Sequence, residues 1–304
     1  MTNIAKFPPH PLDSLFADLM SADYLSRRRI MRFKIKERPR RFHYKYRPVV
    51  FHDPDDKAKG YSERSIDRLR QIIVNSRLYV SCPAEFNDPF DTAADLIATG
   101  TEAQRHERFD QWLLAHGVYD SAKRAELLAD LMARPPEAIT AMFAPGMQNA
   151  RKTTGVISFA GNPRDTLMWS HYASEHTGVC FQFETARDFA ILSRAVTVDY
   201  AEEYPVVNCI VNFQDGLGKM MMNKHPCWTY EDETRIIMDN EAGKYLPFRP
   251  DALRAIILGC RADSTVSLMI DGLLSERAAA GHPKLKVYRA SMHGKKYELV
   301  IRKA

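Results

Sequence analysis

Short apolar runs of strand length, placed between helical segments, constrain the fold of this 304-residue chain most strongly. They recur from Gly155 onward without the regular alternation of strand and helix that typifies a parallel sheet. We expect strands at 155–159, 178–183, 195–200, 233–238, 254–259, 284–289 and 296–302. This spacing predicts an α+β fold with a largely antiparallel central sheet and flanking helices.

The first hundred residues add strands and helices of the same kind. Apolar spacing predicts a helix within 12–36, and Pro39 ends that element. The aromatic run Arg41–Arg47 predicts a strand, and Ser62 is a candidate N-cap for a helix with one apolar face. A short strand follows at 78–81.

A block rich in Ala, Leu and Arg interrupts the strands at about 101–152. Its composition is typical of helices, and Pro136 is suited to the first position of the last one. We therefore expect a helical arm at 1–41 and a single α+β domain at 42–304. The block at 101–152 is then a helical insertion within that domain, either a lid or a fixed buttress.

Positive charge is concentrated near the N-terminus. Residues Arg27 to Arg41 include nine Lys or Arg and one acid, whereas the formal net charge of the whole chain is +5. Such a segment can neutralise phosphates, which makes nucleic acid a candidate partner. A solvated helix face that binds no partner explains the same pattern equally well.

Other bulk features argue for a cytoplasmic protein that does not enter a membrane. No apolar run approaches the ~20 residues of a membrane-spanning helix, and the N-terminus lacks a secretory pattern. The five cysteines are scattered and form no C-x-x-C pair, which is typical of reduced thiols. We therefore predict neither a disulfide framework nor a metal site.

The segment Trp228–Ile237 contains the most site-like residues. If 231–237 is a strand, Glu231, Glu233 and Arg235 share one face because side chains alternate. Two carboxylates so close together repel each other unless a cation or ligand lies between them. The pair is therefore a candidate catalytic site, although an exposed face with a surface ion pair is the simpler alternative.

Three further segments contain candidate binding residues. On the strand before Pro48, Lys45 and Arg47 project to one side and Tyr46 to the other, and a guanidinium suits phosphate. In the later motif Trp169–Ala173, His171 is the candidate general base and Tyr172 a candidate pocket residue. Ser81 and the irregular segment Phe86–Asp91, with Asn87 and Asp88, complete the candidate set, although Asn and Asp also simply tighten loops.

Several of these motifs, taken in order, resemble one bacterial family. They are Tyr44-Lys-Tyr-Arg47, Leu78-Tyr-Val-Ser81, Phe86-Asn-Asp-Pro-Phe-Asp91, Trp169-Ser-His-Tyr-Ala173, Gly178-Val-Cys-Phe181, Tyr230-Glu-Asp-Glu-Thr-Arg235 and Ala255-Ile-Ile-Leu-Gly259. Together they resemble the domain of unknown function 2971 family over about residues 42–302. That family name implies no activity.

A second resemblance, to ADP-ribosyltransferases, implies a chemistry. The strand at 44–47, the helix at 69–75 and the strand at 77–81 are similar to the start of that fold, and Glu231-Asp-Glu233 is similar to its late Glu-x-Glu motif. The sequence departs from the pattern in lacking a Ser-Thr-Ser element and in carrying Asn75-Ser76-Arg77 where the pattern has glycine.

This resemblance implies an NAD-using enzyme, by analogy one of phage defence or toxin systems. Glu233 would be the catalytic carboxylate with Glu231 as its partner, while Lys45 and Arg47 would contact the dinucleotide. The acceptor would be protein, nucleic acid or water. Two alternatives stay open: a non-enzymatic module that binds nucleic acid or protein through 27–41, and a metal-dependent hydrolase built on Asp88, Asp91 and His171.

Overall fold

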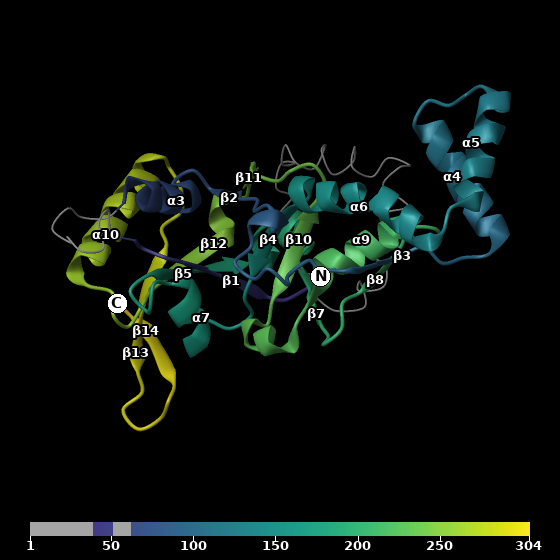
Figure 1. Cartoon of the computed structure of the whole chain (residues 1–304). Helices are drawn as coiled ribbons and strands as arrows, with labels where there is room; N and C mark the ends of the chain where they lie inside the picture. Colours follow the sequence, from purple (N-terminus) through teal and green to yellow (C-terminus); the bar gives the residue numbers. More distant parts are fainter. Residues whose placement is uncertain (1–38, 51–61) are drawn as a thin grey trace, which may run out of the picture.

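The computed structural model describes residues 39–50 and 62–304, and its centre is a five-stranded mixed sheet (Figure 1). The strand order is β1-β5-β12-β13-β14, and only the β12–β13 pair is parallel. The strands are β1 (Phe42–Arg47), β5 (Val179–Glu184), β12 (Leu253–Leu258), β13 (Lys286–Met292) and β14 (Leu299–Lys303). The expected α+β class with a mostly antiparallel sheet is confirmed.

A three-stranded antiparallel sheet lies beside the first, in the order β4-β10-β6. Tyr44 of β1 bridges to Ala160, which directly follows β4, so the two sheets meet at this point. The strands of the second sheet are β4 (Gly155–Phe159), β10 (Thr234–Met238) and β6 (Val196–Thr197). Two-stranded pairs complete the set: β2 (Arg77–Tyr79) with β11 (Tyr245–Pro247), β3 (Asp95–Ile97) with β8 (Val206–Asn208), and β7 (Asp199–Tyr200) with β9 (Asn223–Lys224).

Helices cover both faces of the five-stranded sheet. On one side lie α3 (Glu63–Ile73) and α10 (Ser264–Ala279), held together at the surface by Arg70 and Glu276. Between them and the sheet lies a core that includes Leu69, Phe181 and Ile256. On the other side α7 (Thr166–Tyr172) packs Met168 and Trp169 onto Tyr44, Tyr46, Ala290 and Leu299.

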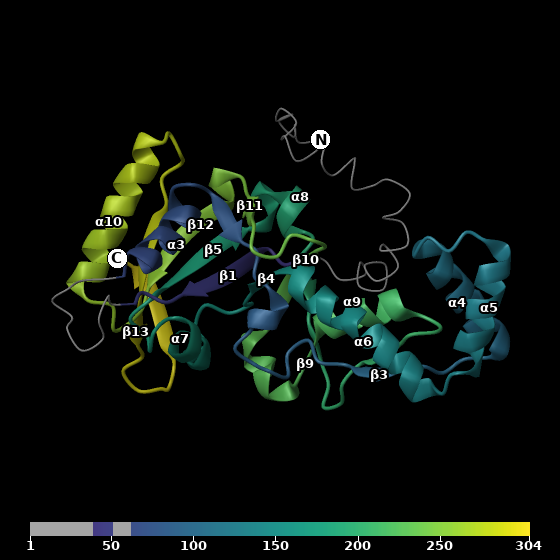
Figure 2. The same ribbon diagram turned by 45° about the horizontal axis from the view of Figure 1, so that its top comes forward.

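The block that the sequence predicts as helical consists of three helices, α4 (Glu102–Ala115), α5 (Ser121–Ala133) and α6 (Pro136–Thr153). Figures 1 and 2 show α4 and α5 side by side, well away from the five-stranded sheet. These two helices share a small core with α6 that includes Phe109, Leu128 and Phe143. Next to α6 lies α9 (Phe213–Met222), whose Met220 and Met221 pack against Val207 of β8.

Two expectations about local structure are wrong. The strand expected at 195–200 is split into β6 and β7, because β6 pairs with β10 whereas β7 pairs with β9. The extension of a strand back to Glu231 is also wrong, since β10 starts at Thr234, in agreement with the strand expected at 233–238. The helix expected within 12–36 lies outside the described residues. Among the residues that the structure does describe, no helix has the length and apolar character needed to cross a bilayer.

Candidate functional site

Glu231 and Glu233 are brought together by a sharp turn and not by a continuous strand. Pro226 begins the 3-10 helix η4 (Pro226–Glu231), and the next residue, Asp232, has a left-handed backbone with φ 45°. The amide of Glu233 then donates to the hydroxyl of Tyr200 just before β10 begins. The expected strand face shared by both glutamates is therefore absent, yet both side chains are buried and point to one cation, Lys224 of β9.

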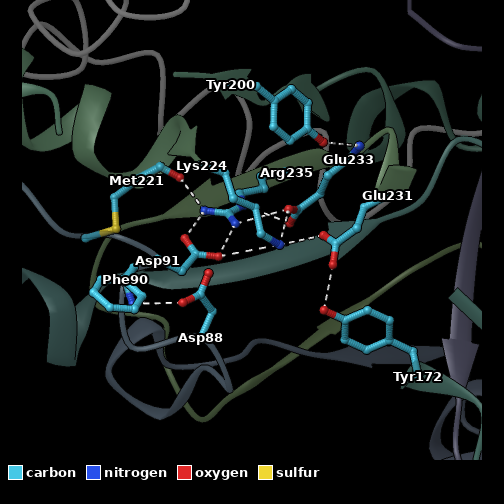
Figure 3. Close-up of polar contacts among 10 residues, drawn as sticks. All are labelled: Asp88, Phe90, Asp91, Tyr172, Tyr200, Met221, Lys224, Glu231, Glu233 and Arg235. Carbon is cyan, nitrogen blue, oxygen red and sulfur yellow. Dashed lines mark hydrogen bonds and ion pairs between the residues drawn. The ribbon is translucent and has the colours of Figure 1, made fainter. Parts of the chain in front are cut away.

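Lys224 lies at the centre of a buried charge network (Figure 3). Its Nζ donates to Glu231 Oε2 and, over 3.2 Å, to Glu233 Oε2. A third carboxylate, Asp91 Oδ2, lies 3.7 Å from the same nitrogen. Burial lowers the pKa of Lys224, but Glu233, Glu231 and Asp91 outweigh burial and raise it, so the ammonium stays charged.

Arg235 of β10 closes the network on the side of the loop Phe86–Asp91. Its Nη1 and Nη2 donate to the two carboxylate oxygens of Asp91 over 2.9 and 2.6 Å, and its Nε donates to Glu233 Oε1 over 2.8 Å. Nη1 also donates to the carbonyl of Met221. Such paired geometry stabilises a buried guanidinium that burial alone would strongly disfavour.

The network carries more negative than positive charge. Three carboxylates (Asp91, Glu231 and Glu233) face two cations (Lys224 and Arg235), which leaves one excess negative charge. Burial opposes ionisation of Glu233, yet Arg235 and Lys224 together lower its pKa to about 2. Burial raises the pKa of Glu231 against the opposing effect of Lys224, so the excess charge is least stable on this carboxylate.

Tyr172 connects this buried network with the surface. Its hydroxyl donates to Glu231 Oε1 over 2.6 Å, as Figure 3 shows. The ring of Tyr172 also lines an open cleft of about 350 Å³. The other lining residues come from β2, the segment after it, and α7: Tyr79, Ser81, Cys82, Glu85, Phe86, Asn87 and His171. Glu231 is thus one hydrogen bond away from a cleft with aromatic walls.

Further aromatic rings extend this wall. His171 lies within about 6.5 Å, centroid to centroid, of the rings of Tyr172, Trp228 and Tyr230. Trp228 also covers Lys224, whose Nζ lies 4.9 Å from the ring centroid. Aromatic faces near a negative network attract planar and cationic groups.

Four of the eleven predicted site residues line the cleft. Ser81, Asn87, His171 and Tyr172 come together there, and Glu231 lies directly behind Tyr172. Glu233 and Arg235 lie deeper in the network and do not line the cleft. Asp88 accepts from the amide of Phe90 and tightens the loop, which is the alternative explanation for this residue type.

The cationic strand does not line this cleft, contrary to expectation. Lys45 is buried and donates to the carbonyl of Ser158, and burial, followed by the charge of Arg47, lowers its pKa well below the ordinary value. Tyr46 lies on the opposite face of β1, where its hydroxyl donates to the carbonyl of Asn162 and its ring packs edge-on against Trp169. Burial, followed by the charge of Arg68, lowers the pKa of Arg47 to about 10.

The sequence did not predict two members of the network as partners of the glutamates. Lys224 is a lone lysine in a two-residue strand, and only the parallel pairing of β9 with β7 brings it to the acid pair. Asp91 reads as a loop residue, and its role depends on Arg235, which is 144 positions away in sequence. The structure gives no support to the metal-site alternative. Asp91 is ion-paired with Arg235 and Lys224. Among the described residues, no group of three His, Cys, Asp or Glu side chains is placed so that it could hold a metal ion.

In the comparisons with known proteins, one family model matches part of the chain. Residues 168–236 match the family model described as protein of unknown function (DUF2971). The resemblance noted in the motifs is thereby confirmed over the segment that holds α7, Lys224, both glutamates and Arg235. No curated protein and no solved structure matches the chain. The DUF2971 match thus includes most of the charge network but brings no activity with it.

Proposed function

We propose that the cleft binds NAD⁺ and that the protein cleaves its nicotinamide–ribose bond, as ADP-ribosyltransferases and NAD glycohydrolases do. The observation that carries this proposal is the path from the cleft through Tyr172 to Glu231, within a network that has one excess negative charge. A ligand that is both planar and positively charged complements this site best. The pyridinium ring of NAD⁺ has both properties.

The cleft suits such a ring on two counts. Tyr79, Phe86, His171 and Tyr172 supply aromatic faces, against which a cationic ring gains roughly 1–2 kcal/mol when it is desolvated. The amide of Asn87 and the hydroxyl of Ser81 supply donors and acceptors of the kind that a carboxamide requires. A cleft of about 350 Å³ accommodates the nicotinamide–ribose half of the dinucleotide and leaves the rest outside.

The chemistry follows from charge placement. When the C1′–N bond breaks, its electron pair leaves with nicotinamide, which becomes neutral, and positive charge develops on the ribosyl carbon. Glu231 stabilises that charge through the Tyr172 oxygen, whose proton it already binds. A hydroxyl of the acceptor, or water, then forms the new bond at C1′ and releases its proton to the Tyr172 oxygen, while Tyr172 passes its own proton to the Glu231 carboxylate. Glu233 acts as a positioning residue, because it fixes Lys224 and Arg235.

Release of nicotinamide from NAD⁺ by the purified full chain, followed by chromatography, tests the activity directly. Glu231→Gln keeps the shape and the hydrogen-bond acceptor but removes the charge, so we expect a rate lower by about 10²–10³-fold. Glu241→Gln, a surface change at a residue paired with Lys244, serves as the matched control and keeps wild-type activity. Equal rates for the two variants, or no nicotinamide from the wild type, would refute the proposal.

Binding offers a second, independent readout. NAD⁺ and NADH differ in the charge of the nicotinamide ring and little in size. If the site recognises that charge, NAD⁺ should raise the melting temperature of the protein more than NADH does. The difference shrinks in Glu231→Gln and persists in Glu241→Gln. Equal stabilisation by both dinucleotides would show that ring charge is not recognised.

A further inference from the structure

The hairpin formed by β13 and β14 extends beyond the sheet to which it belongs. β13 pairs with β12 only through Arg289, whereas its pairing with β14 continues to Met292 and Leu299. Residues past Arg289 therefore form a two-stranded ribbon, which Figures 1 and 2 show as a loop projecting from the body. Internal hydrogen bonds order its tip: the amide of His293 donates to the carbonyl of Glu298, and that of Lys295 to the His293 ring.

This ribbon and its base are strongly basic. Residues 282–304 contain seven Lys or Arg and a single acid, Glu298. Arg289 is turned inward, where its guanidinium donates to the carbonyl of Ala262 and the hydroxyl of Ser267. The other six are exposed: Lys284, Lys286, Lys295, Lys296, Arg302 and Lys303. Glu298 approaches one of them, Lys296, only to 4.0 Å.

The tip also exposes apolar surface among these cations. Tyr297 is fully exposed and Met292 is 81 % exposed, although neither contributes to a core. The phenol ring of Tyr297, next to Lys296, buries no surface and so adds little to the stability of the fold. In proteins that bind single-stranded nucleic acid, by contrast, aromatic rings stack on bases while Lys and Arg contact phosphates.

The ribbon shares its support with the cleft. Tyr288, Ala290, Leu299 and Ile301 of the hairpin pack in one core with Met168 and Trp169 of α7. The same helix ends with His171 and Tyr172, which line the cleft. A polymer held along the ribbon is therefore anchored to the helix that forms one wall of the candidate site.

We infer that the β13–β14 hairpin is a contact surface for single-stranded nucleic acid, with Lys295 and Lys296 on phosphates and Tyr297 stacked on a base. An acidic protein would satisfy the lysines but offers no regular array of planar rings to Tyr297. An anionic membrane would require a broader apolar face than the two exposed side chains, Met292 and Tyr297, provide. The inference does not depend on NAD⁺ chemistry, since binding is measured without any dinucleotide.

Fluorescence anisotropy of a labelled 20-nucleotide single strand, titrated with the full chain at 50–200 mM NaCl, tests this inference. Lys295→Gln/Lys296→Gln should weaken binding roughly tenfold and lower the slope of log K against log salt by about 1.4, the value for two phosphate contacts on a single strand. The matched control, Lys123→Gln/Lys219→Gln, changes the net charge equally at exposed helix positions far from the hairpin in sequence and keeps wild-type affinity. Tyr297→Ala should weaken binding to the single strand more than binding to a duplex of the same sequence.

Each other outcome overturns the inference. Equal affinity of the hairpin variant and its control would place any binding elsewhere, including the basic segment 27–41. No binding of the strand by the wild type would exclude nucleic acid altogether. Tight binding to phosphatidylserine vesicles, lost in the hairpin variant while the strand is ignored, would assign the surface to a membrane. Both double variants change exposed side chains only, so a folding defect does not obscure the comparison.

Discussion

The hydroxyl of Tyr172 and Glu231 Oε1 lie 2.6 Å apart, and this hydrogen bond is the link between the cleft and the buried charges. Burial, followed by the charge of Glu231, raises the pKa of Tyr172, so the phenol keeps its proton and remains a donor. Glu231 in turn has one partner that faces the cleft, Tyr172, and one that faces the network, Lys224.

Tyr172→Phe should remove the hydrogen bond that joins the cleft to the buried charge network. It removes one oxygen and leaves the ring in the cleft wall, so we expect nicotinamide release to fall at least tenfold while NAD⁺ still stabilises the protein. Loss of the hydrogen bond to Glu231 should cost about 1–2 kcal/mol of unfolding free energy, measured by urea denaturation. Tyr230→Phe changes a neighbouring ring and is the control. Wild-type turnover in Tyr172→Phe would show that the hydroxyl takes no part.

Asp91→Asn should reveal how much the fold depends on the network. It leaves the buried Arg235 guanidinium with Glu233 as its remaining carboxylate partner, and removing one partner of a buried ion pair typically costs about 3–5 kcal/mol. Asp130→Asn removes the exposed partner of Arg134 and should cost less than about 1 kcal/mol. Urea unfolding of both variants measures the difference. Similar, small losses in the two would mean that water reaches Arg235.

His43 makes stability depend on pH. Burial, and then the charge of Arg40, lower its pKa from 6.5 to about 4, and its Nδ1 lies 3.1 Å from the hydroxyl oxygen of Thr234. The fold therefore favours the neutral ring: this contribution is complete above pH 6.5 and is lost as pH falls towards 4. The free energy of unfolding should drop by roughly 3 kcal/mol over this window, apart from other groups.

His43→Gln removes that titration, so its unfolding free energy should change less between pH 6.5 and 4 than that of the wild type. His106→Gln, at an exposed position of α4, keeps the wild-type profile. Denaturation midpoints at intervals of half a pH unit measure both. Parallel profiles for the wild type and His43→Gln would assign the acid sensitivity to other residues.

Two glycines should respond to alanine in opposite ways. A Cβ on Gly259, after β12, would lie 2.0 Å from the carbonyl oxygen of His176, so Gly259→Ala must displace backbone and should cost several kcal/mol. Gly272 lies within α10 with nothing within 4 Å of the added atom, so Gly272→Ala should stabilise the protein by up to about 1 kcal/mol. Thermal melts of the two variants check the signs. A neutral Gly259→Ala would show that the loop at His176 yields easily.

The sequence pattern predicted an element correctly where the structure of that element depends on its own residues. β4 has the expected ends, Gly155 and Phe159, because the run is apolar apart from Ser158 and is buried almost completely. The helix after Ser62 and the one that begins at Pro136 also lie close to their expected positions. In each case the prediction rests on the spacing of apolar residues within the element or on a proline at the first position of a helix.

The sequence pattern did not predict the position of residues that are placed by contacts with segments distant in sequence. Strand alternation placed Glu231 beside Glu233, but Pro226 starts a 3-10 helix and Asp232 adopts a left-handed turn, where Arg40 donates to its carboxylate and carbonyl. The position of Lys224 follows from a parallel pairing of two-residue strands, which no periodicity reveals. Cationic residues of β1 were placed at the site because of their charge, although Lys45 is used inside the fold.

The loop Phe86–Asp91 has a mechanical consequence for any ligand. Its first two residues line the cleft, and its last is fixed to Arg235 by two hydrogen bonds, with the Phe86 ring 5.5 Å from that same guanidinium. A molecule that pushes the wall outward must therefore stretch an ion pair in the interior. The rigidity of the cleft wall therefore depends on the ion pair behind it. Substitution of Asp91 or Arg235 would change the shape of the cleft, although neither residue lines it.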